Sequence, residues 1–197
     1  MSWPGPESYK FCPVCGGRLE NRQIKAGEPR RPVCTACGFV FYIDPKLAVI
    51  ALVPYRGGLV MVRRSIEPGY GLWVVPGGFV DVGEKVEDAV VRETREEANL
   101  IVRVVRLLNV HSYQDSRTVV LSYITEYVSG ELAAGDEELE AQVFSRQEIN
   151  RRRSRIQGSL DACCIIRAVR FADAFPVGQI VVPVGRRFLH RQVERGS

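Results

Sequence analysis

The sequence lacks an apolar segment long enough to cross a membrane. Its longest apolar runs cover residues 47–54 and 72–75, whereas a transmembrane helix needs roughly 18 or more apolar residues. Residues 1–6 also lack the apolar stretch that a secretory signal peptide requires. These absences exclude a helical membrane span and predict a cytoplasmic protein that contacts no membrane.

The sequence also lacks the extremes of composition that mark disordered or fibrous chains. Its 197 residues are 46% hydrophobic and 25% charged, with a net charge of +4, which is typical of one globular domain with a small additional module. The charge is divided unevenly. Residues 1–43 hold six Lys/Arg against three Asp/Glu, residues 44–150 eleven against seventeen, and residues 151–197 ten against three. An acidic centre between basic ends argues against nucleic acid as the main partner and indicates metal-binding carboxylates.

Four of the six cysteines form two Cys-x2-Cys pairs, with eighteen residues between Cys12/Cys15 and Cys34/Cys37. This spacing is typical of a four-thiolate Zn²⁺ site, in which each tight turn supplies two sulfur ligands. Four protein ligands leave no coordination position open for water, so this zinc would serve folding rather than catalysis. A redox pair or disulfides are the alternatives. The doubled motif disfavours the first, and the absence of a signal peptide disfavours the second.

The stretch from residue 39 to residue 53 connects this module to the rest of the chain. It is β-branched and apolar except at Asp44-Pro45-Lys46, which predicts a last ribbon strand, a hinge, and a first strand of the main domain over residues 47–53. Four cations on the loop between the cysteine pairs offer a contact for nucleic acid, although solubility is the simpler role. They are Arg22, Lys25, Arg30 and Arg31.

Residues 84–98 predict an amphipathic helix, because this charged stretch contains no Gly or Pro and its apolar residues recur at three- and four-residue steps. Glu93, Glu96 and Glu97 are related by the same steps, which places their carboxylates side by side. Like charges so placed repel unless a divalent cation such as Mg²⁺ or Mn²⁺ binds them. The alternative is a solvated acidic face that Arg92 and Arg95 make tolerable.

The helix belongs to a longer motif. Residues 78–100 read Gly-x5-Glu-x7-Arg-Glu-Thr-Arg-Glu-Glu-Ala-Asn-Leu, which resembles the Nudix box, Gly-x5-Glu-x7-Arg-Glu-U-x-Glu-Glu-x-Gly-U, where U is apolar. Thr94 and Asn99 depart from that pattern, and Asn, like Gly, tolerates the left-handed conformation that ends a helix. With its cysteine module and Asp44-Pro45 link, the chain resembles the zinc-ribbon Nudix hydrolases over about residues 9–150. NADH, FAD and ADP-ribose pyrophosphatases are among them.

The resemblance implies an α/β fold, a Nudix α/β/α sandwich with a mixed β-sheet, preceded by a small N-terminal zinc ribbon. It divides the chain into a zinc ribbon at residues 1–43, a Nudix hydrolase domain at 44–175, and a C-terminal strand and basic tail at 176–197. It also implies a pyrophosphatase that uses Mg²⁺ or Mn²⁺ to cleave the diphosphate of a nucleoside diphosphate-linked substrate into two monophosphates.

The motif match also assigns roles within the site. The Gly78 carbonyl, Glu96 and Glu97 would bind the metal, and Glu93 would be a further ligand or the base that deprotonates water. Glu84 and Arg92 would hold the loop to the helix. An acidic site can bind a pyrophosphate only through cations, which also lower the pKa of an attacking water.

A further carboxylate from a later loop is expected, because many Nudix enzymes use one. Residues 136–144 contain the candidates Glu138 and Glu140, of which Glu140 is retained in the predicted metal site. An acidic loop before a strand is the alternative for either residue.

Residues near the box are candidates for binding the substrate. Arg63 and its neighbour Arg64 would reach a phosphate, or they only form a solvated strand end. Aromatic side chains would stack on an adenine or flavin ring, although core or rim packing is the better explanation for each of them taken singly. The Ser-Gln-Pro-Trp-Pro-Phe-Pro stretch of NADH pyrophosphatases is absent, which favours an FAD- or ADP-ribose-like substrate over NADH. The aromatic candidates are Tyr70, Trp73 and Phe79, followed by His111 and Tyr113.

The C-terminal part is basic and leaves several alternatives open. The arginine-rich residues 151–155 would attract an anionic substrate, RNA or nothing specific. A helix is predicted over residues 159–171, and a strand over 179–185 would pack on a second subunit in a homodimer or only solvate the chain end. Besides a hydrolase, the sequence allows an interaction module, or a nucleic-acid-binding or regulatory protein with an inactive Nudix scaffold. The intact box glutamates favour the hydrolase.

Overall fold

The computed structural model describes residues 5–151, except for 68, 113 and 115. The predicted C-terminal helix and strand, the arginines after Arg151 and the aromatic candidate Tyr113 lie outside the described residues. Within the described part of the chain, no helix has both the length and the hydropathy of a membrane span.

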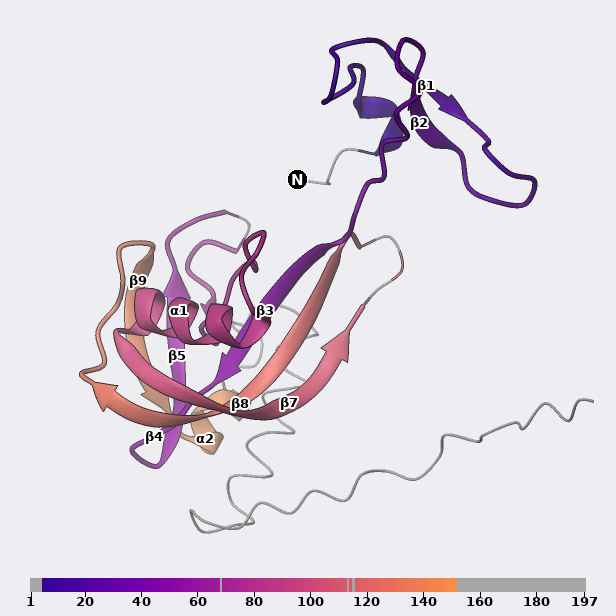
Figure 1. The fold of residues 1–197 in the computed structure, drawn as a ribbon. Coiled ribbons are helices and arrows are strands. Elements are labelled where there is room, and N and C mark those ends of the chain that lie inside the picture. The colour runs from indigo at the N-terminus through magenta and orange to yellow at the C-terminus, as the bar shows by residue number, and fades with distance from the viewer. Residues whose placement is uncertain (1–4, 68, 113, 115, 152–197) are drawn as a thin grey trace, which may run out of the picture.

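The N-terminal module is a small β ribbon that stands apart from the main body of the protein (Figure 1). A single 3-10 turn, η1 (Pro6–Ser8), precedes β1 (Leu19–Arg22) and β2 (Arg31–Cys34), which pair in antiparallel fashion. The chain after the second cysteine pair lies along the other edge of β2, where Val33 forms a bridge with Val40. The ribbon is therefore built around β2.

The three-stranded sheet of the main domain has the order β3–β8–β7 and is mixed. Strand β3 (Lys46–Leu52) runs parallel to β8 (Thr118–Gly130), and β8 runs antiparallel to β7 (Leu100–His111). Parallel neighbours cannot be joined by a tight turn. The chain between β3 and β8 therefore contains most of the domain, including the box.

A second sheet has four strands. One of them, β5, pairs in antiparallel fashion with each of the other three. Its strands are β4 (Pro54–Tyr55), β5 (Gly58–Arg64), β6 (Trp73–Val74) and β9 (Glu138–Phe144). The middle of β5 is fully buried, because it is covered from both faces. One face packs into the core beneath the box helix, and the other into a second apolar cluster with Trp73 and Phe144.

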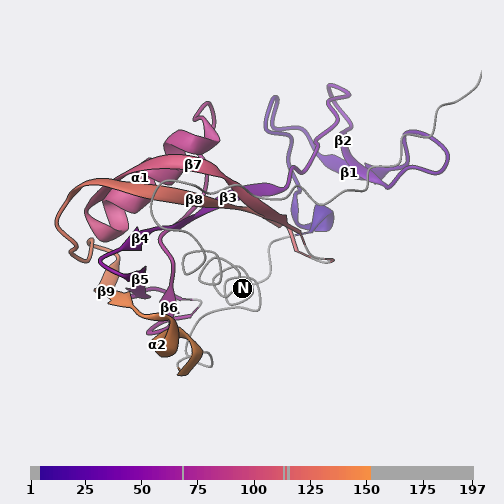
Figure 2. The ribbon, with the colours of Figure 1, turned by 90° about the horizontal axis from the view of Figure 1, so that it is seen from below.

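Helix α1 (Val86–Ala98) and the shorter α2 (Arg146–Arg151) lie on opposite sides of the sheets (Figure 2). Helix α1 buries Ala89, Val90, Thr94 and Ala98, the stripe that the spacing predicts. It ends at Asn99, which has a left-handed φ of 55° and donates its backbone N–H to the Arg95 carbonyl. Asparagine therefore does here what the glycine of the box pattern would do.

Arg117, just before β8, ties the ribbon and the linker to the sheet. Its Nε donates to the Asp44 carbonyl at 3.1 Å, and its own carbonyl accepts the Lys46 N–H at 2.7 Å. Its Nη1 donates to the Tyr9 hydroxyl of the ribbon at 3.1 Å. Hydrogen bonds from a residue of the main domain thus fix the backbone on both sides of the predicted hinge at Asp44-Pro45.

Candidate metal centres and active site

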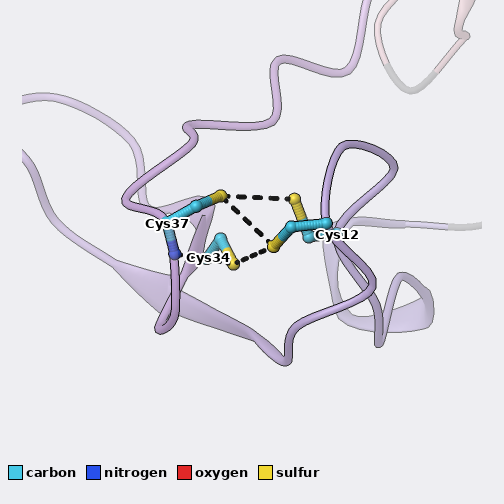
Figure 3. Close-up of side chains that lie close together, drawn as sticks. Cys12, Cys34 and Cys37 are labelled. Carbon is cyan, nitrogen blue, oxygen red and sulfur yellow. Dashed lines mark hydrogen bonds between the residues drawn. The ribbon is translucent and has the colours of Figure 1, made fainter.

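The side chains of Cys12, Cys34 and Cys37 point toward one another (Figure 3), and Cys15 completes the group. All four Sγ atoms lie within 4.8 Å of one another. The sulfur of Cys37 is 3.3 Å from that of Cys15 and 3.8 Å from that of Cys12, and all four thiols are free. Four thiolates bound about 2.3 Å from one zinc ion stand about 3.8 Å apart in a tetrahedron. The cluster therefore has the size and the ligand set that a zinc ion requires.

Tight turns aim these sulfurs inward. Gly16 and Gly38, each one residue after a cysteine pair, have a φ of +74°, which favours glycine. The Val14 N–H donates to the Cys12 sulfur at 3.4 Å, and the Cys37 N–H donates to the Cys34 sulfur at 3.5 Å. The Cys37 N–H is the main cause that lowers the pKa of Cys34 to about 6. This hydrogen bond favours the thiolate, which is the form that binds metal.

The glycine turn before α1 fits closely against two box glutamates. The Gly77 N–H donates to Glu97 Oε2 at 2.8 Å. A Cβ at position 78 would lie 2.4 Å from Glu93 Oε1, so a larger residue there would displace that carboxylate from its observed position. The Gly78 carbonyl accepts the Val49 N–H at 2.8 Å, which ties the turn to β3. The oxygen has a second lone pair, and its predicted bond to a metal stays a prediction.

Arg92 connects the turn to the helix. Its Nε and Nη2 donate to the two oxygens of Glu84 at 2.7 and 2.8 Å, and its Nη1 donates to Glu93 at 2.8 Å and to Glu96 at 3.1 Å. Its Nη2 also donates to the Phe79 carbonyl. The hydrogen bonds from Arg92 are the main cause that lowers the pKa of Glu84 to about 2. The predicted link between loop and helix is thus present in the geometry.

Carboxylates gather beside Arg92 on the inner side of α1. Burial, with smaller contributions from the charges of Glu138 and Glu93, raises the pKa of Glu97 to about 8, although the Gly77 hydrogen bond opposes this shift. Burial is also the main cause that raises the pKa of Glu138 to about 7, and the charge of Glu137 adds to the shift. The pKa of Glu93 is likewise raised by burial, against the opposing effect of Arg92. Burial is the main cause of the pKa shifts at Glu93 and Glu97, and the Glu93 side chain is only 12% exposed, so a fully solvated acidic face does not describe these two residues.

Strand β9 brings Glu138 to this cluster, and it does not bring Glu140. Glu140 instead accepts a hydrogen bond from Arg63 Nη1 at 2.7 Å and another from Gln142 Nε2 at 3.1 Å. The structure therefore does not bring the predicted ligand Glu140 to the box carboxylates and brings the other candidate, Glu138, instead; metal binding by Glu138 stays a prediction. The physical reason is an irregularity of register between β5 and β9, which places the two glutamates differently.

Two predicted substrate-binding residues have structural partners instead. Trp73 is only 4% exposed, and its ring packs 4.7 Å from that of Phe144. Arg63 Nε donates to the Gly71 carbonyl at 3.1 Å, and its Nη1 is occupied by Glu140. Trp73 is thus a core residue rather than a stacking surface, and Arg63 holds neighbouring chain segments together.

The remaining predicted residues keep accessible positions. Tyr70 is 58% exposed in the loop before β6, and Phe79 is 47% exposed directly after the glycine turn. The Phe79 carbonyl accepts a hydrogen bond from Arg92, so the backbone of Phe79 lies beside the box glutamates that Arg92 contacts. His111 is the last residue of β7. Of these residues, Phe79 has the position that best fits contact with a substrate at the cluster.

Sequence reasoning missed Gly135, in the loop between β8 and β9. A Cβ there would lie 2.0 Å from the Glu96 carbonyl oxygen, and the Gly135 N–H donates to the Glu97 carbonyl at 3.1 Å. This close approach lets the loop pack on the end of α1 just before Glu138. A glycine directly before an acidic stretch is the signal that could have found it.

The fold and the cluster define an α/β domain with a box-helix carboxylate site, joined to a four-cysteine ribbon. A family model of the NUDIX domain matches residues 44–161, and the model of the Nudix N-terminal zinc ribbon matches residues 10–43. The chain therefore belongs to the Nudix family and carries that family's N-terminal zinc ribbon. The predicted family and fold class are confirmed.

Similar proteins include an ADP-ribose pyrophosphatase of Methanocaldococcus jannaschii, 38% identical over an alignment of 107 residues that covers 52% of this chain and 63% of that protein. The NAD-capped RNA hydrolase NudC of Pseudomonas aeruginosa is 34% identical over 137 residues, 69% of this chain and 48% of NudC. The chain thus spans less than two thirds of either relative. A crystal structure of a NUDIX hydrolase from Nitrosomonas europaea superposes with a TM-score of 0.79 at 27% identity, covering 84% of this chain and 93% of that one.

Proposed function

We propose that the protein is a divalent-metal-dependent pyrophosphohydrolase that cleaves the diphosphate of a nucleoside diphosphate-linked compound into two monophosphates. One observation carries this proposal. Glu93, Glu97 and Glu138 gather in a partly buried cluster whose carboxyl groups have raised pKa values. Such a cluster is unfavourable without a cation, and its hard oxygen ligands suit Mg²⁺ or Mn²⁺.

The residues of the cluster would have different roles in the reaction. Glu96, Glu97 and Glu138 would hold the cation, and Glu93 would be a further ligand or the base that takes a proton from water. Arg92 fixes the orientation of Glu93 and Glu96 through its hydrogen bonds. When bound, Mg²⁺ or Mn²⁺ supplies positive charge that screens the diphosphate and makes water more acidic. Without such charge, the acidic site would repel its substrate.

For the ribbon, we propose one structural zinc ion per chain on Cys12, Cys15, Cys34 and Cys37. The convergence of the four sulfurs and the match to the Nudix N-terminal zinc ribbon support it. Elemental analysis of the purified protein should find one zinc per chain. Folded protein with a content far below one would refute the assignment.

ADP-ribose and FAD are the substrates we favour. The M. jannaschii relative named ADP-ribose pyrophosphatase supports the first. NAD-capped RNA is the second candidate, because several relatives are named NAD-capped RNA hydrolase. We place it lower, because the chain lacks the Ser-Gln-Pro-Trp-Pro-Phe-Pro stretch that the resemblance associates with NADH-type substrates.

A substrate panel tests the proposal. It contains ADP-ribose, FAD, NADH, NAD-capped RNA and an oxidised deoxynucleoside triphosphate, each with Mg²⁺, with Mn²⁺ and without metal. We expect metal-dependent release of AMP together with FMN or ribose 5-phosphate, and poor use of the triphosphate. A triphosphate with by far the largest kcat/KM would refute the substrate class. NAD-capped RNA as the best substrate would reverse our ranking, and hydrolysis by no member of the panel would refute the function.

A further inference from the structure

Strand β9 carries two glutamates, Glu138 and Glu140, whose spacing should place them on the same face. Successive side chains of a strand point to opposite faces, so residues two apart normally share one. The pairing with β5 breaks this rule. Arg63 is opposite Glu140, and Arg64 is opposite Glu138, so Leu139 is an extra residue in β9. Such a bulge reverses the alternation beyond it.

The two glutamates consequently meet different partners. Glu138 lies beside the end of the box helix, because a Cβ at Gly135 would be 3.0 Å from Glu138 Oε2 and 2.0 Å from the Glu96 carbonyl oxygen. The charge of Glu138 acts on Glu97, and the charge of Arg64 acts on Glu138. Glu140 lies with Arg63, whose Nη1 donates to it at 2.7 Å. On this strand, the bulge decides which glutamate reaches the box cluster.

Contacts on both sides hold the bulge in place. Before it, the Glu137 carbonyl accepts hydrogen bonds from both the backbone N–H and the hydroxyl of Ser65. After it, Glu140 accepts from Arg63, whose Nε is in turn fixed by the Gly71 carbonyl. Leu139 itself is 39% exposed, so apolar packing does little to fix the register. A slip of one residue would turn Glu138 away from Glu97.

We propose that Arg63 and Glu140 form a positioning pair, which locks the register of β9 so that Glu138 is aimed at Glu97. Glu140 therefore acts on the metal site through Glu138 and does not itself touch the metal. This inference rests on the proposed function, because Glu138 is a metal ligand only if the cluster binds a divalent cation.

Glu140→Gln tests the pair, because it keeps the shape of the side chain but removes the charge that holds Arg63. We expect the affinity for Mn²⁺, measured by calorimetric titration of the zinc-loaded protein, to fall about tenfold or more, as for other groups that orient a metal ligand. The kcat for ADP-ribose should fall in parallel. The matched control is Glu126→Gln, which removes the partner of Arg103 in another cross-strand pair and should leave both quantities unchanged.

Two further variants separate positioning from other roles. In Glu138→Gln, the additional change Glu140→Gln should cause no further loss, because the residue that Glu140 positions is already disabled. The exchanged pair, Arg63→Glu with Glu140→Arg, should restore Mn²⁺ affinity to within about threefold of the parent, since it restores the attraction that the single change removes.

The outcomes are distinct. Parent-like Mn²⁺ affinity in Glu140→Gln, independent losses from Glu138→Gln and Glu140→Gln, or no rescue by the exchanged pair would each overturn the positioning pair. A parent protein that binds Mn²⁺ but hydrolyses no diphosphate would refute the proposed function alone, and the positioning pair would then be judged on Mn²⁺ affinity. A parent that binds no Mn²⁺ would overturn both.

Discussion

The ribbon and the box hold their proposed metal ligands in opposite ways. Among the described residues of the ribbon, only Cys12, Pro32 and Cys34 are buried, so the cysteines are themselves a large part of its interior. The box carboxylates instead lie on a domain with two apolar clusters of its own. Protein contacts already hold them, from Arg92 at one side and from Gly77 at the other.

We therefore expect the two metals to have different effects: zinc would stabilise the fold of the ribbon, and the divalent cation at the box would mainly relieve repulsion between carboxylates. A module of about 40 residues cannot bury enough apolar surface to fold by itself, so we expect the ribbon to depend on zinc. The box helix folds without metal, because the domain has its own apolar core, but its crowded carboxylates destabilise the metal-free state. Metal removal should therefore unfold the first region and leave the fold of the second intact.

The largest expected effect is the loss of the ribbon in Cys34→Ser. Metal binding contributes about 10–16 kcal/mol in small zinc modules, which exceeds anything that the ribbon interior can replace. Hydrogen exchange should show residues 5–43 unprotected and the main domain still protected. Val14→Ser, at a 68% exposed position of the same turn, is the control and should behave like the parent. Protected ribbon amides in a zinc-free Cys34→Ser protein would contradict this contrast.

A smaller effect is expected from Arg92→Met. The change leaves Glu84, Glu93 and Glu96 without the guanidinium that pairs with them, and unpaired, partly buried carboxylates are destabilising. The Tm of the main domain should fall by several degrees at neutral pH, and less at pH 4, where carboxyl groups are protonated. Arg95→Met, an exposed arginine on the same helix, should change the Tm little. If the two variants lowered the Tm equally, the ion pairs of Arg92 with the three glutamates would not stabilise the domain.

The smallest expected effect is a pH dependence. The pKa of Glu97 is about 8 in the folded protein against an ordinary value of 4.5, so between these values the folded state binds more protons than the unfolded state. Stability must therefore fall as pH rises through this window. Without added divalent metal, Glu97→Gln should gain Tm relative to the parent as the pH rises from 5.5 to about 8.5. If the Tm of Glu97→Gln minus that of the parent stayed constant or became smaller as the pH rose, a raised pKa at Glu97 would be excluded.

The features that the sequence predicted well are those whose residues lie close together along the chain. The two cysteine pairs and the box are local patterns, and a tight turn or a helix converts such spacing directly into geometry. The buried stripe of α1 follows from its periodicity in the same way. The roles of Glu84 and Arg92 came from the family resemblance, and the structure brings these two residues together.

Features that depend on distant pairing could not be predicted. The choice between Glu138 and Glu140 depends on the bulge opposite Arg63 and Arg64, which no pattern within residues 136–144 reveals. Trp73 was misassigned because closeness in sequence to the box does not tell which face of a strand a side chain occupies. Its ring meets Phe144, seventy-one residues further along the chain.

The central claim is that the glutamates of α1 bind a divalent cation that the reaction requires. The direct test measures Mn²⁺ affinity and ADP-ribose hydrolysis in the parent and in Glu97→Gln, beside thermal melts without added metal. The variant keeps the side-chain shape but loses a hard anionic ligand, so activity should fall by about two orders of magnitude or more, with weakened Mn²⁺ binding. At neutral pH its metal-free Tm should equal that of the parent or slightly exceed it, because Glu97 with a pKa of about 8 is mostly uncharged there and the change removes only the small charged fraction. An active Glu97→Gln protein with undiminished Mn²⁺ binding would contradict the claim.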